Sequence, residues 1–192
     1  IKRSPKELLF VGRIDPIKNL EKIVDLATEL KNEESGFRFK IVGDPGEKNK
    51  KYLFFIKRLI KGKKVEGNFK FFGGVPNKQL PQYYNQASFF VDFSSIYGVN
   101  KTLLEAMACG CIPITNQTTI KPFLGPYSND IFVQSVDEAK NKILDLYHNK
   151  QKREKLSKEL SQLIQKNHNL DNLTDKLVNI FKIEADRLTS CG

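Results

Sequence analysis

The first residues whose types and spacing suit chemistry are a glycine and two cations, Gly12, Arg13 and Lys18. They follow a short apolar run and precede a helical pattern that starts near Leu20. A guanidinium and an ammonium group beside the free N–H groups of a helix N-terminus suit a phosphate, and glycine lets a ligand approach the backbone. Either cation alone is typical of a solvated surface charge. Together, at this spacing, they favour an anion-binding function.

A second candidate is Glu105, the single carboxylate in an apolar segment from residue 103 to residue 108. Asn100 is a good N-cap for this segment, and Gly110 suits the position just past the helix end. Apolar residues cover most of the helix surface, so the pattern predicts a helix sunk in the core. A carboxylate buried there needs a polar partner, which makes Glu105 a candidate site residue.

The sequence gives little support to a metal site. Cys109 and Cys111 form only a Cys-x-Cys pair, Cys191 lies near the terminus, and both histidines stand in polar, helical contexts. The odd number of cysteines favours reduced thiols in a cytoplasmic compartment. The first residues do not form a signal-peptide pattern, and no apolar run approaches the roughly 20 residues that span a bilayer. We therefore expect a cytoplasmic protein without a bound metal.

The chain carries 32 basic residues against 22 acidic ones, a net charge of +10. Much of the excess lies between Lys48 and Lys64, where cations surround an apolar stripe in an amphipathic helical pattern. Such an excess indicates an anionic partner, and several interpretations stay open. We favour a solvated helix face, and the second interpretation is peripheral contact with an anionic membrane. We expect no nucleic-acid partner, because no nucleic-acid motif accompanies the charge.

Strands and helices alternate in the first two thirds of the chain. Apolar runs predict strands at residues 7–13, 37–42, 68–72, 88–93 and 111–115, with a short sixth strand at 131–133. Helical patterns lie between them, the first capped by Asn19. This alternation predicts right-handed crossovers and an α/β, Rossmann-like, doubly wound parallel sheet of about six strands. Ligands are then expected beyond the carboxyl ends of the strands.

From Asp137 onward the pattern is helical only, with apolar positions at 139–147, 156–164 and 173–181. The length suits one well-cored domain, so we expect a single domain over 1–192, with an α/β core at about 7–136 and a helical tail at 137–192. Met107 is the only methionine. We therefore expect that a chain beginning at Ile1 continues a longer protein.

Motifs occur in order over about residues 7–115. The first is Val11-Gly12-Arg13 with Lys18 in the following loop, and the next strand endings are Ile41-Val42-Gly43 and Phe71-Phe72-Gly73. The last, Glu-Ala-Met-Ala-x-Gly-x-Pro-hydrophobic, runs from Glu105 to Ile114. In this order, the motifs resemble the carboxyl-terminal, nucleotide-sugar-binding half of GT-B glycosyltransferases of the retaining family 4. The last motif is the most specific of them.

The resemblance implies sugar transfer from a UDP- or GDP-sugar donor to an acceptor glycan or lipid-linked glycan. Gly12 would let the donor come close to the backbone. The catalytic Arg13 and Lys18 would bind the donor's pyrophosphate and neutralise the charge that grows on the leaving nucleoside diphosphate. No metal or other cofactor is required. An N-terminal acceptor domain, absent from this chain, would complete the enzyme. The isolated domain is therefore expected to be inactive, and any membrane contact to be peripheral.

Other donor-binding roles also follow from the resemblance. Glu105 would accept hydrogen bonds from the ribose hydroxyls. Backbone N–H groups around Thr102 and Leu103 would meet the phosphates. Val75 and Pro76, after the third strand, would border the base.

One position departs from the family pattern, which has two glutamates with seven residues between them. Counting back from Glu105 leads to Tyr97, followed by Gly98. The donor sugar would then be held by the Tyr97 hydroxyl and loop N–H groups, and Asp92 is a candidate to replace the missing acid in part. Two hypotheses stay open: an active transferase, which we favour, and a non-catalytic nucleotide-sugar-binding or scaffold module.

Overall fold

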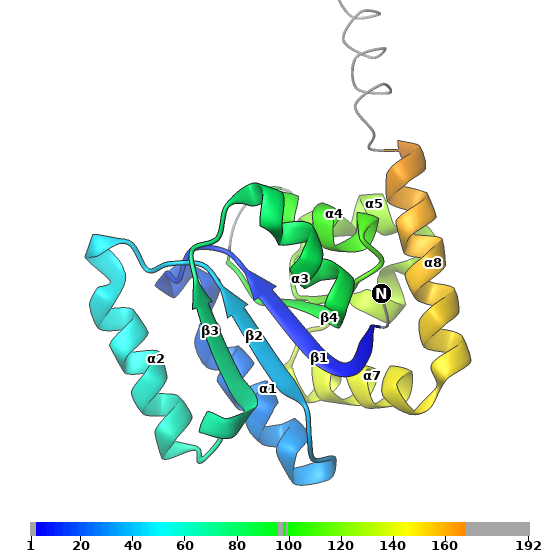
Figure 1. The fold of residues 1–192 in the computed structure, drawn as a ribbon. Helices are drawn as coiled ribbons and strands as arrows, with labels where there is room; N and C mark the ends of the chain where they lie inside the picture. The colour runs from blue at the N-terminus through cyan, green and yellow to red at the C-terminus, as the bar shows by residue number, and fades with distance from the viewer. Residues whose placement is uncertain (1–2, 96–97, 99, 168–192) are drawn as a thin grey trace, which may run out of the picture.

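The computed structural model of the chain describes residues 3–95, 98 and 100–167. Its centre is a five-stranded sheet in the order β3-β2-β1-β4-β5, with every neighbouring pair parallel (Figure 1). The strands are β1 (Ser4–Val11), β2 (Arg38–Val42), β3 (Phe69–Gly73), β4 (Ala87–Asp92) and β5 (Ile112–Thr115). Helices connect them, so the predicted Rossmann-like, doubly wound fold is confirmed.

The prediction of a sixth strand at 131–133 was wrong. Ile131 ends the short helix α6 (Ser128–Ile131), and Phe132 forms only an isolated bridge with Thr115. The Val133 N–H donates to the Thr115 carbonyl at 2.9 Å, but Ser135 then caps the next helix. The segment is therefore too short for a ladder of hydrogen bonds, although its apolar residues resemble a strand.

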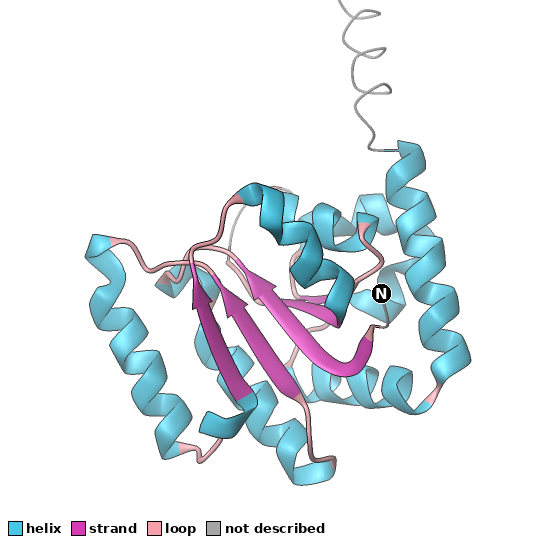
Figure 2. Ribbon diagram, viewed as in Figure 1, coloured by secondary structure: helices cyan, strands magenta, loops and turns pink. Residues whose placement is uncertain are grey.

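Helices cover both faces of the sheet (Figure 2). The longer ones are α1 (Leu20–Glu33), α2 (Lys50–Gly62), α3 (Leu80–Gln86), α4 (Lys101–Ala108), α7 (Val136–His148) and α8 (Lys150–Asn167). Short turns complete the described part: α5 (Lys121–Leu124) and the 3₁₀ segments η1 (Pro16–Lys18), η2 (Glu47–Asn49), η3 (Glu66–Asn68), η4 (Asn77–Gln79), η5 (Thr118–Ile120) and η6 (Gly125–Tyr127).

Alternate residues of β1 enter two separate cores. Leu8 and Phe10 pack with α1, α2 and α7, whereas Leu9 and Val11 pack with α3 and α4. This follows from the period of two along a strand that is covered on both faces. α8 packs along α4 at the β5 side of the sheet.

The helical tail begins as predicted with α7 and α8. The predicted helix over 173–181 lies outside the described residues. Within the described residues, no helix combines the length and the apolar character needed to cross a membrane.

Asn19 stands at the start of α1 as predicted, but it does not cap the helix with its side chain. The residue closes η1 in a left-handed conformation with φ of 49°, which asparagine tolerates better than most residues. Its side-chain amide instead donates to the Phe93 carbonyl at 2.8 Å and to Ser95 Oγ at 2.9 Å. Asn19 therefore ties the loop after β1 to the loop after β4.

Candidate functional site

Glycines follow β1, β2 and β3 along the carboxyl edge of the sheet. Gly43 has φ of +139°, and a Cβ there would lie 1.9 Å from the carbonyl oxygen of Gly12. At Gly74, a Cβ would lie 2.2 Å from Asp44 Oδ2. A side chain cannot fit at Gly43, and one at Gly74 would require Asp44 to move, so the strand ends pack closely and leave backbone exposed beside a pocket.

That pocket has a volume of about 260 Å³ and lies between the strand ends and the first turns of α4. The structure brings four predicted site residues together in its wall, namely Gly12, Val75, Thr102 and Glu105. The other lining residues are Val11, Val42, Gly43, Gly74, Asn77, Leu80 and Lys101. The pocket therefore joins three strand ends, η4 and α4.

Glu105 is not buried in the core, so that prediction was wrong. Its side chain is 32% exposed and faces the pocket, whereas Leu103, Ala106 and Met107 form the buried face of α4. The Tyr84 hydroxyl donates to Glu105 Oε2 at 3.0 Å, and Lys101 Nζ lies 3.3 Å from Oε1. The carboxylate is thus held at the pocket wall and stays accessible to a ligand.

Tyr84 is a site residue that the sequence did not reveal. It comes from α3 and is buried, and burial together with the nearby Glu105 carboxylate raises the pKa of its hydroxyl. The hydroxyl therefore stays protonated and donates to the carboxylate. In the sequence, Tyr84 resembles any other apolar position of an amphipathic helix, because its polar partner lies 21 residues away.

The N-terminus of α4 is capped as predicted by Asn100. Asn100 Oδ1 accepts from the Thr102 N–H at 3.2 Å and from the Thr102 hydroxyl at 2.9 Å. The Leu103 N–H donates to the Asn100 carbonyl at 3.0 Å, and the Leu103 side chain is buried. A phosphate at this helix end must therefore share these N–H groups with the cap or displace it.

The Asp92 carboxylate is buried and occupied by other hydrogen bonds, so it is not available to replace the missing acid. It is 1% exposed and accepts hydrogen bonds from the Ser94 N–H at 3.0 Å, from Asn100 Nδ2 at 2.7 Å and from Gln117 Nε2 at 2.7 Å. The Ser94 hydroxyl donates to the same carboxylate. Asp92 therefore fixes the loop after β4 and holds the cap of α4.

Arg13 and Lys18 flank this edge of the sheet. Arg13 is exposed, and Lys18 is half-buried with its Cε 3.6 Å from the place of a Cβ on Gly12. Lys18 thus lies next to Gly12, one of the lining residues, but neither Lys18 nor Arg13 lines the pocket itself. Within the described part of the chain, neither side chain has a hydrogen bond or an ion pair.

The remaining predicted site residues are more peripheral. Pro76 is exposed beside Val75 and does not line the pocket. Gly98 is exposed with φ of +114°, and its carbonyl accepts from the Thr119 hydroxyl at 2.9 Å. Tyr97 lies outside the described residues.

A second pocket of about 240 Å³ continues from the first between α3 and α4. Both pockets share Glu105, and the second extends to Tyr84 and Cys109. Burial raises the pKa of the Cys109 thiol, and it raises that of Cys111 to about 12. These thiols are therefore protonated and unsuited to nucleophilic chemistry. Among the described residues, no group of three or more His, Cys, Asp or Glu side chains is arranged to hold a metal ion.

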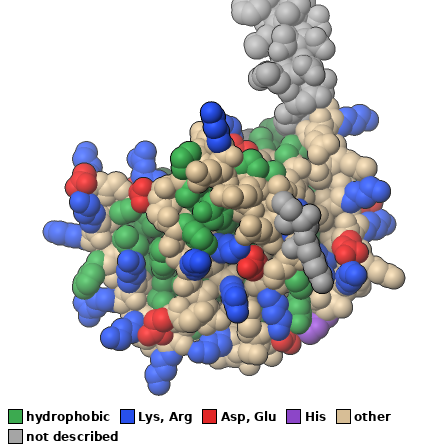
Figure 3. Space-filling view, in the orientation of Figure 1, with side chains coloured by type: hydrophobic (Ala, Val, Ile, Leu, Met, Phe, Trp, Pro, Cys, Tyr) green, Lys and Arg blue, Asp and Glu red, His purple; other side chains and the backbone are tan. Residues whose placement is uncertain are grey.

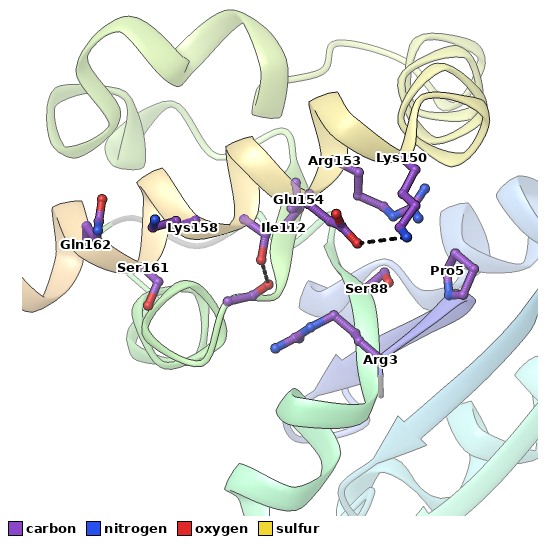
Figure 4. Close-up of a pocket in the computed structure, with 12 residues that line it drawn as sticks. Arg3, Pro5, Ser88, Ile112, Lys150, Arg153, Glu154, Lys158, Ser161 and Gln162 are labelled. Carbon is purple, nitrogen blue, oxygen red and sulfur yellow. Dashed lines mark hydrogen bonds and ion pairs between the residues drawn. The ribbon is translucent and has the colours of Figure 1, made fainter. Parts of the chain in front are cut away.

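A larger pocket, of about 750 Å³, lies at the opposite edge of the sheet, against α8 (Figure 4). Arg3, a half-buried cation in its wall, is bound to the backbone: the guanidinium donates to the carbonyls of Tyr84, Ala87 and Cys109 at 2.8, 2.6 and 2.6 Å. Parallel sheets bind ligands at their carboxyl edge. We therefore assign the candidate site to the smaller pocket.

The model of a family described as "Glycosyl transferases group 1" matches residues 1–162. The chain is 27% identical over 180 residues to the O-antigen chain mannosyltransferase B of Escherichia coli. This alignment covers 91% of this chain and 45% of that protein. The chain therefore spans less than half of the length of this relative.

Solved structures share the fold. The Anabaena protein HepE in complex with UDP-glucose superposes with a TM-score of 0.82 at 15% identity, over 92% of this chain and 48% of HepE. A stand-alone C-terminal domain of the glycosyl transferase group 1 family protein LpcC from Francisella tularensis gives a TM-score of 0.77 at 17% identity. That match covers 88% of each chain.

Proposed function

The chain belongs to the family of glycosyl transferases group 1, and on this premise we propose that it is the donor-binding half of a glycosyltransferase. Its site would take a UDP- or GDP-sugar. The observation that carries this proposal is the pocket that gathers Gly12, Thr102 and Glu105, with Lys18 next to Gly12. The related HepE structure, which holds UDP-glucose, supports this class of ligand.

Lys18 and Arg13 are proposed to bind the pyrophosphate. Neither cation has a partner among the described residues, so a ligand phosphate does not need to break an existing ion pair. As the glycosidic bond breaks, negative charge grows on the leaving nucleoside diphosphate, and two positioned cations stabilise it. Asn19 would help to position Lys18, because it anchors the end of η1 (Pro16–Lys18) through two hydrogen bonds.

Glu105 is proposed to accept hydrogen bonds from the ribose hydroxyls. One carboxylate oxygen is held by Tyr84 and the other by Lys101, and each oxygen keeps capacity for a further donor. Val75 lines the same pocket, where with Pro76 it would border the base. The orientation of Glu105 before binding reduces the ordering cost of recognition.

We propose that the donor's sugar and phosphates bind at the loop after β4 and the start of α4. Thr102 and Leu103 would offer backbone N–H groups to the phosphates, in competition with the Asn100 cap. Tyr97 and Gly98 would contact the sugar. The reaction would require no metal, because the two cations and the helix end supply positive charge.

The whole protein would carry an N-terminal domain for the acceptor, a glycan or lipid-linked glycan. The chain spans 45% of its mannosyltransferase relative, which leaves room for such a domain in a protein of similar length. The isolated chain would then bind donor without transferring sugar. We propose a cytoplasmic location for it and no nucleic-acid partner.

Calorimetric titration of the chain with UDP, GDP and ADP tests the proposal. One of these ligands should bind, and Arg13→Ala should abolish its binding. Lys158→Ala is the matched control, because Lys158 is an exposed cation at the opposite edge and should not affect affinity. Absence of binding at millimolar concentration would show that the donor-site assignment is wrong.

Tyr97 stands where the family pattern has its first glutamate, which favours a second candidate function: a non-catalytic nucleotide-sugar-binding or scaffold module. Transfer by the wild-type full-length protein would rule it out. Absence of transfer, with none gained on Tyr97→Glu, would support it.

A further inference from the structure

The outward face of α2 is both apolar and cationic. The large hydrophobic side chains exposed in the described part of the chain are Ile17, Phe54 and Phe55, and the last two are neighbours on α2 with 64% and 49% of their surface exposed. Ile56 and Ile60 fill the buried face of the helix. Two exposed phenylalanines side by side are costly in water and indicate a contact surface.

The cations of α2 share this outward face. With about 3.6 residues per turn, Lys51 and Arg58 lie between the directions of Phe54 and Phe55, opposite the buried isoleucines. The Arg58 guanidinium lies 6.0 Å from the centre of the Phe54 ring. In the region of α2 and β3, Figure 3 shows hydrophobic side chains with Lys and Arg around them.

These cations are not neutralised by the protein. The sequence of α2 contains no Asp or Glu, and among the described residues Lys51, Lys57, Arg58 and Lys61 have no carboxylate partner. Only Lys50 of this helix is paired, with Glu47 at 2.7 Å. The face therefore presents apolar rings within an uncompensated positive field, which is complementary to a negatively charged partner.

We propose that the outward face of α2 docks the protein on an anionic lipid surface. The rings enter the boundary between headgroups and acyl chains, and the cations bind the lipid phosphates. A protein partner fits less well, because lysine is depleted at protein–protein interfaces. A nucleic acid fits less well because stacked bases need a groove, and the three pockets described above lie on other elements. The docking does not depend on donor binding.

The test is co-sedimentation of the chain with phosphatidylcholine vesicles that contain or lack phosphatidylglycerol. We expect binding to the anionic vesicles only, weakened by salt. Two independent variants divide the contributions: Phe54→Ser/Phe55→Ser removes the rings, and Lys51→Glu/Arg58→Glu reverses the charge. Each variant should lower the affinity for the anionic vesicles at least about tenfold. The first loses the apolar area that the rings bury in the membrane, and the second loses about fivefold in affinity for each basic residue near the surface. Both change exposed side chains, so the melting temperature should stay near that of the wild type.

Lys155→Glu/Lys158→Glu on α8 is the control with an equal change in charge, and it should sediment like the wild type. No binding to anionic vesicles would overturn the proposal. Equal loss in the α8 control would overturn the assignment to α2. A titration with a single-stranded RNA tests the nucleic-acid alternative. If the wild type binds RNA but not vesicles, and Phe54→Ser/Phe55→Ser abolishes the RNA binding, a nucleic-acid surface would replace the lipid-docking proposal.

Discussion

The two edges of the sheet both hold cations beside a pocket, but they use them differently. At the amino edge, the Arg3 guanidinium donates to three backbone carbonyls and therefore stabilises the fold. At the carboxyl edge, Arg13 and Lys18 have no partner among the described residues. Arg153, the other guanidinium in the larger pocket, likewise donates to the carbonyls of Leu146 and Tyr147. The larger volume therefore does not indicate guanidinium groups that are available to a ligand, whereas Arg13 and Lys18 beside the smaller pocket are available.

The largest expected effect is on the structural edge. Arg3→Ala leaves three carbonyls without their charged donor, and we expect the free energy of unfolding to fall by about 3 kcal/mol. Urea denaturation followed by circular dichroism measures this. Lys158→Ala, in the same pocket but at an exposed position, should stay within about 0.5 kcal/mol of the wild type. Equal stability of both variants would remove the distinction between the two edges.

Lys18→Ala sharpens the comparison from the other edge. Stability should change by less than about 0.5 kcal/mol, because the ammonium group has no partner to lose. Affinity for the nucleoside diphosphate should fall by about 2 kcal/mol, or roughly thirtyfold, as a charged hydrogen bond to phosphate is lost. Calorimetry of the variant beside Arg13→Ala gives both values. A large loss of stability with intact affinity would make Lys18 a structural residue like Arg3.

Tyr84 lies between the two edges, and Tyr84→Phe tests whether they are separate. Its carbonyl accepts from Arg3, whereas its hydroxyl donates to Glu105. Removing the hydroxyl leaves the Arg3 contact intact, so we expect a loss of only about 1 kcal/mol in stability and a similar loss in ligand affinity. A loss as large as that of Arg3→Ala would show that the two edges act as one unit.

The smallest effect is a pH dependence. Burial and the Glu105 carboxylate raise the pKa of Tyr84 above its ordinary value of 10.0. As pH rises through that value, the unfolded chain releases this proton first, so the folded state binds more protons and the free energy of unfolding falls. At pH 10.5 this residue should account for about 0.8 kcal/mol of lost stability. The free energies of unfolding of wild type and Tyr84→Phe, measured from about pH 8 to about pH 10.5, should converge by that amount. A constant difference between the two proteins would contradict this prediction.

Features that depend on neighbouring residues were predictable from the sequence. The cap of α4 by Asn100, the helix end at Gly110 and the apolar strands follow from local preferences, and the fold follows from their alternation. Gly12 and Glu105 were site candidates from their residue types and positions, Val75 and Thr102 were added by the family resemblance, and all four line one pocket.

Features that depend on distant partners were not predictable. Arg3 and Cys109 are 106 residues apart, and Tyr84 and Glu105 are 21 residues apart. Asp92 looked like a donor-sugar ligand because it stands at a strand end, yet its carboxylate is saturated by three side chains and one backbone N–H. The alternation of apolar and polar residues along the chain predicts which side of a helix or strand is buried. It does not predict which distant residue will hydrogen-bond to a polar side chain.

The left-handed joint at Asn19 has a consequence for how the site can move. Its amide holds the Phe93 carbonyl and Ser95 Oγ, and the Ser95 N–H donates to the Ile17 carbonyl at 2.9 Å. The segment that carries Lys18 and the start of the loop after β4 are therefore coupled mechanically, since either one can shift alone only by breaking these bonds. A displacement of η1 would therefore carry Ser95 with it as long as these hydrogen bonds are intact.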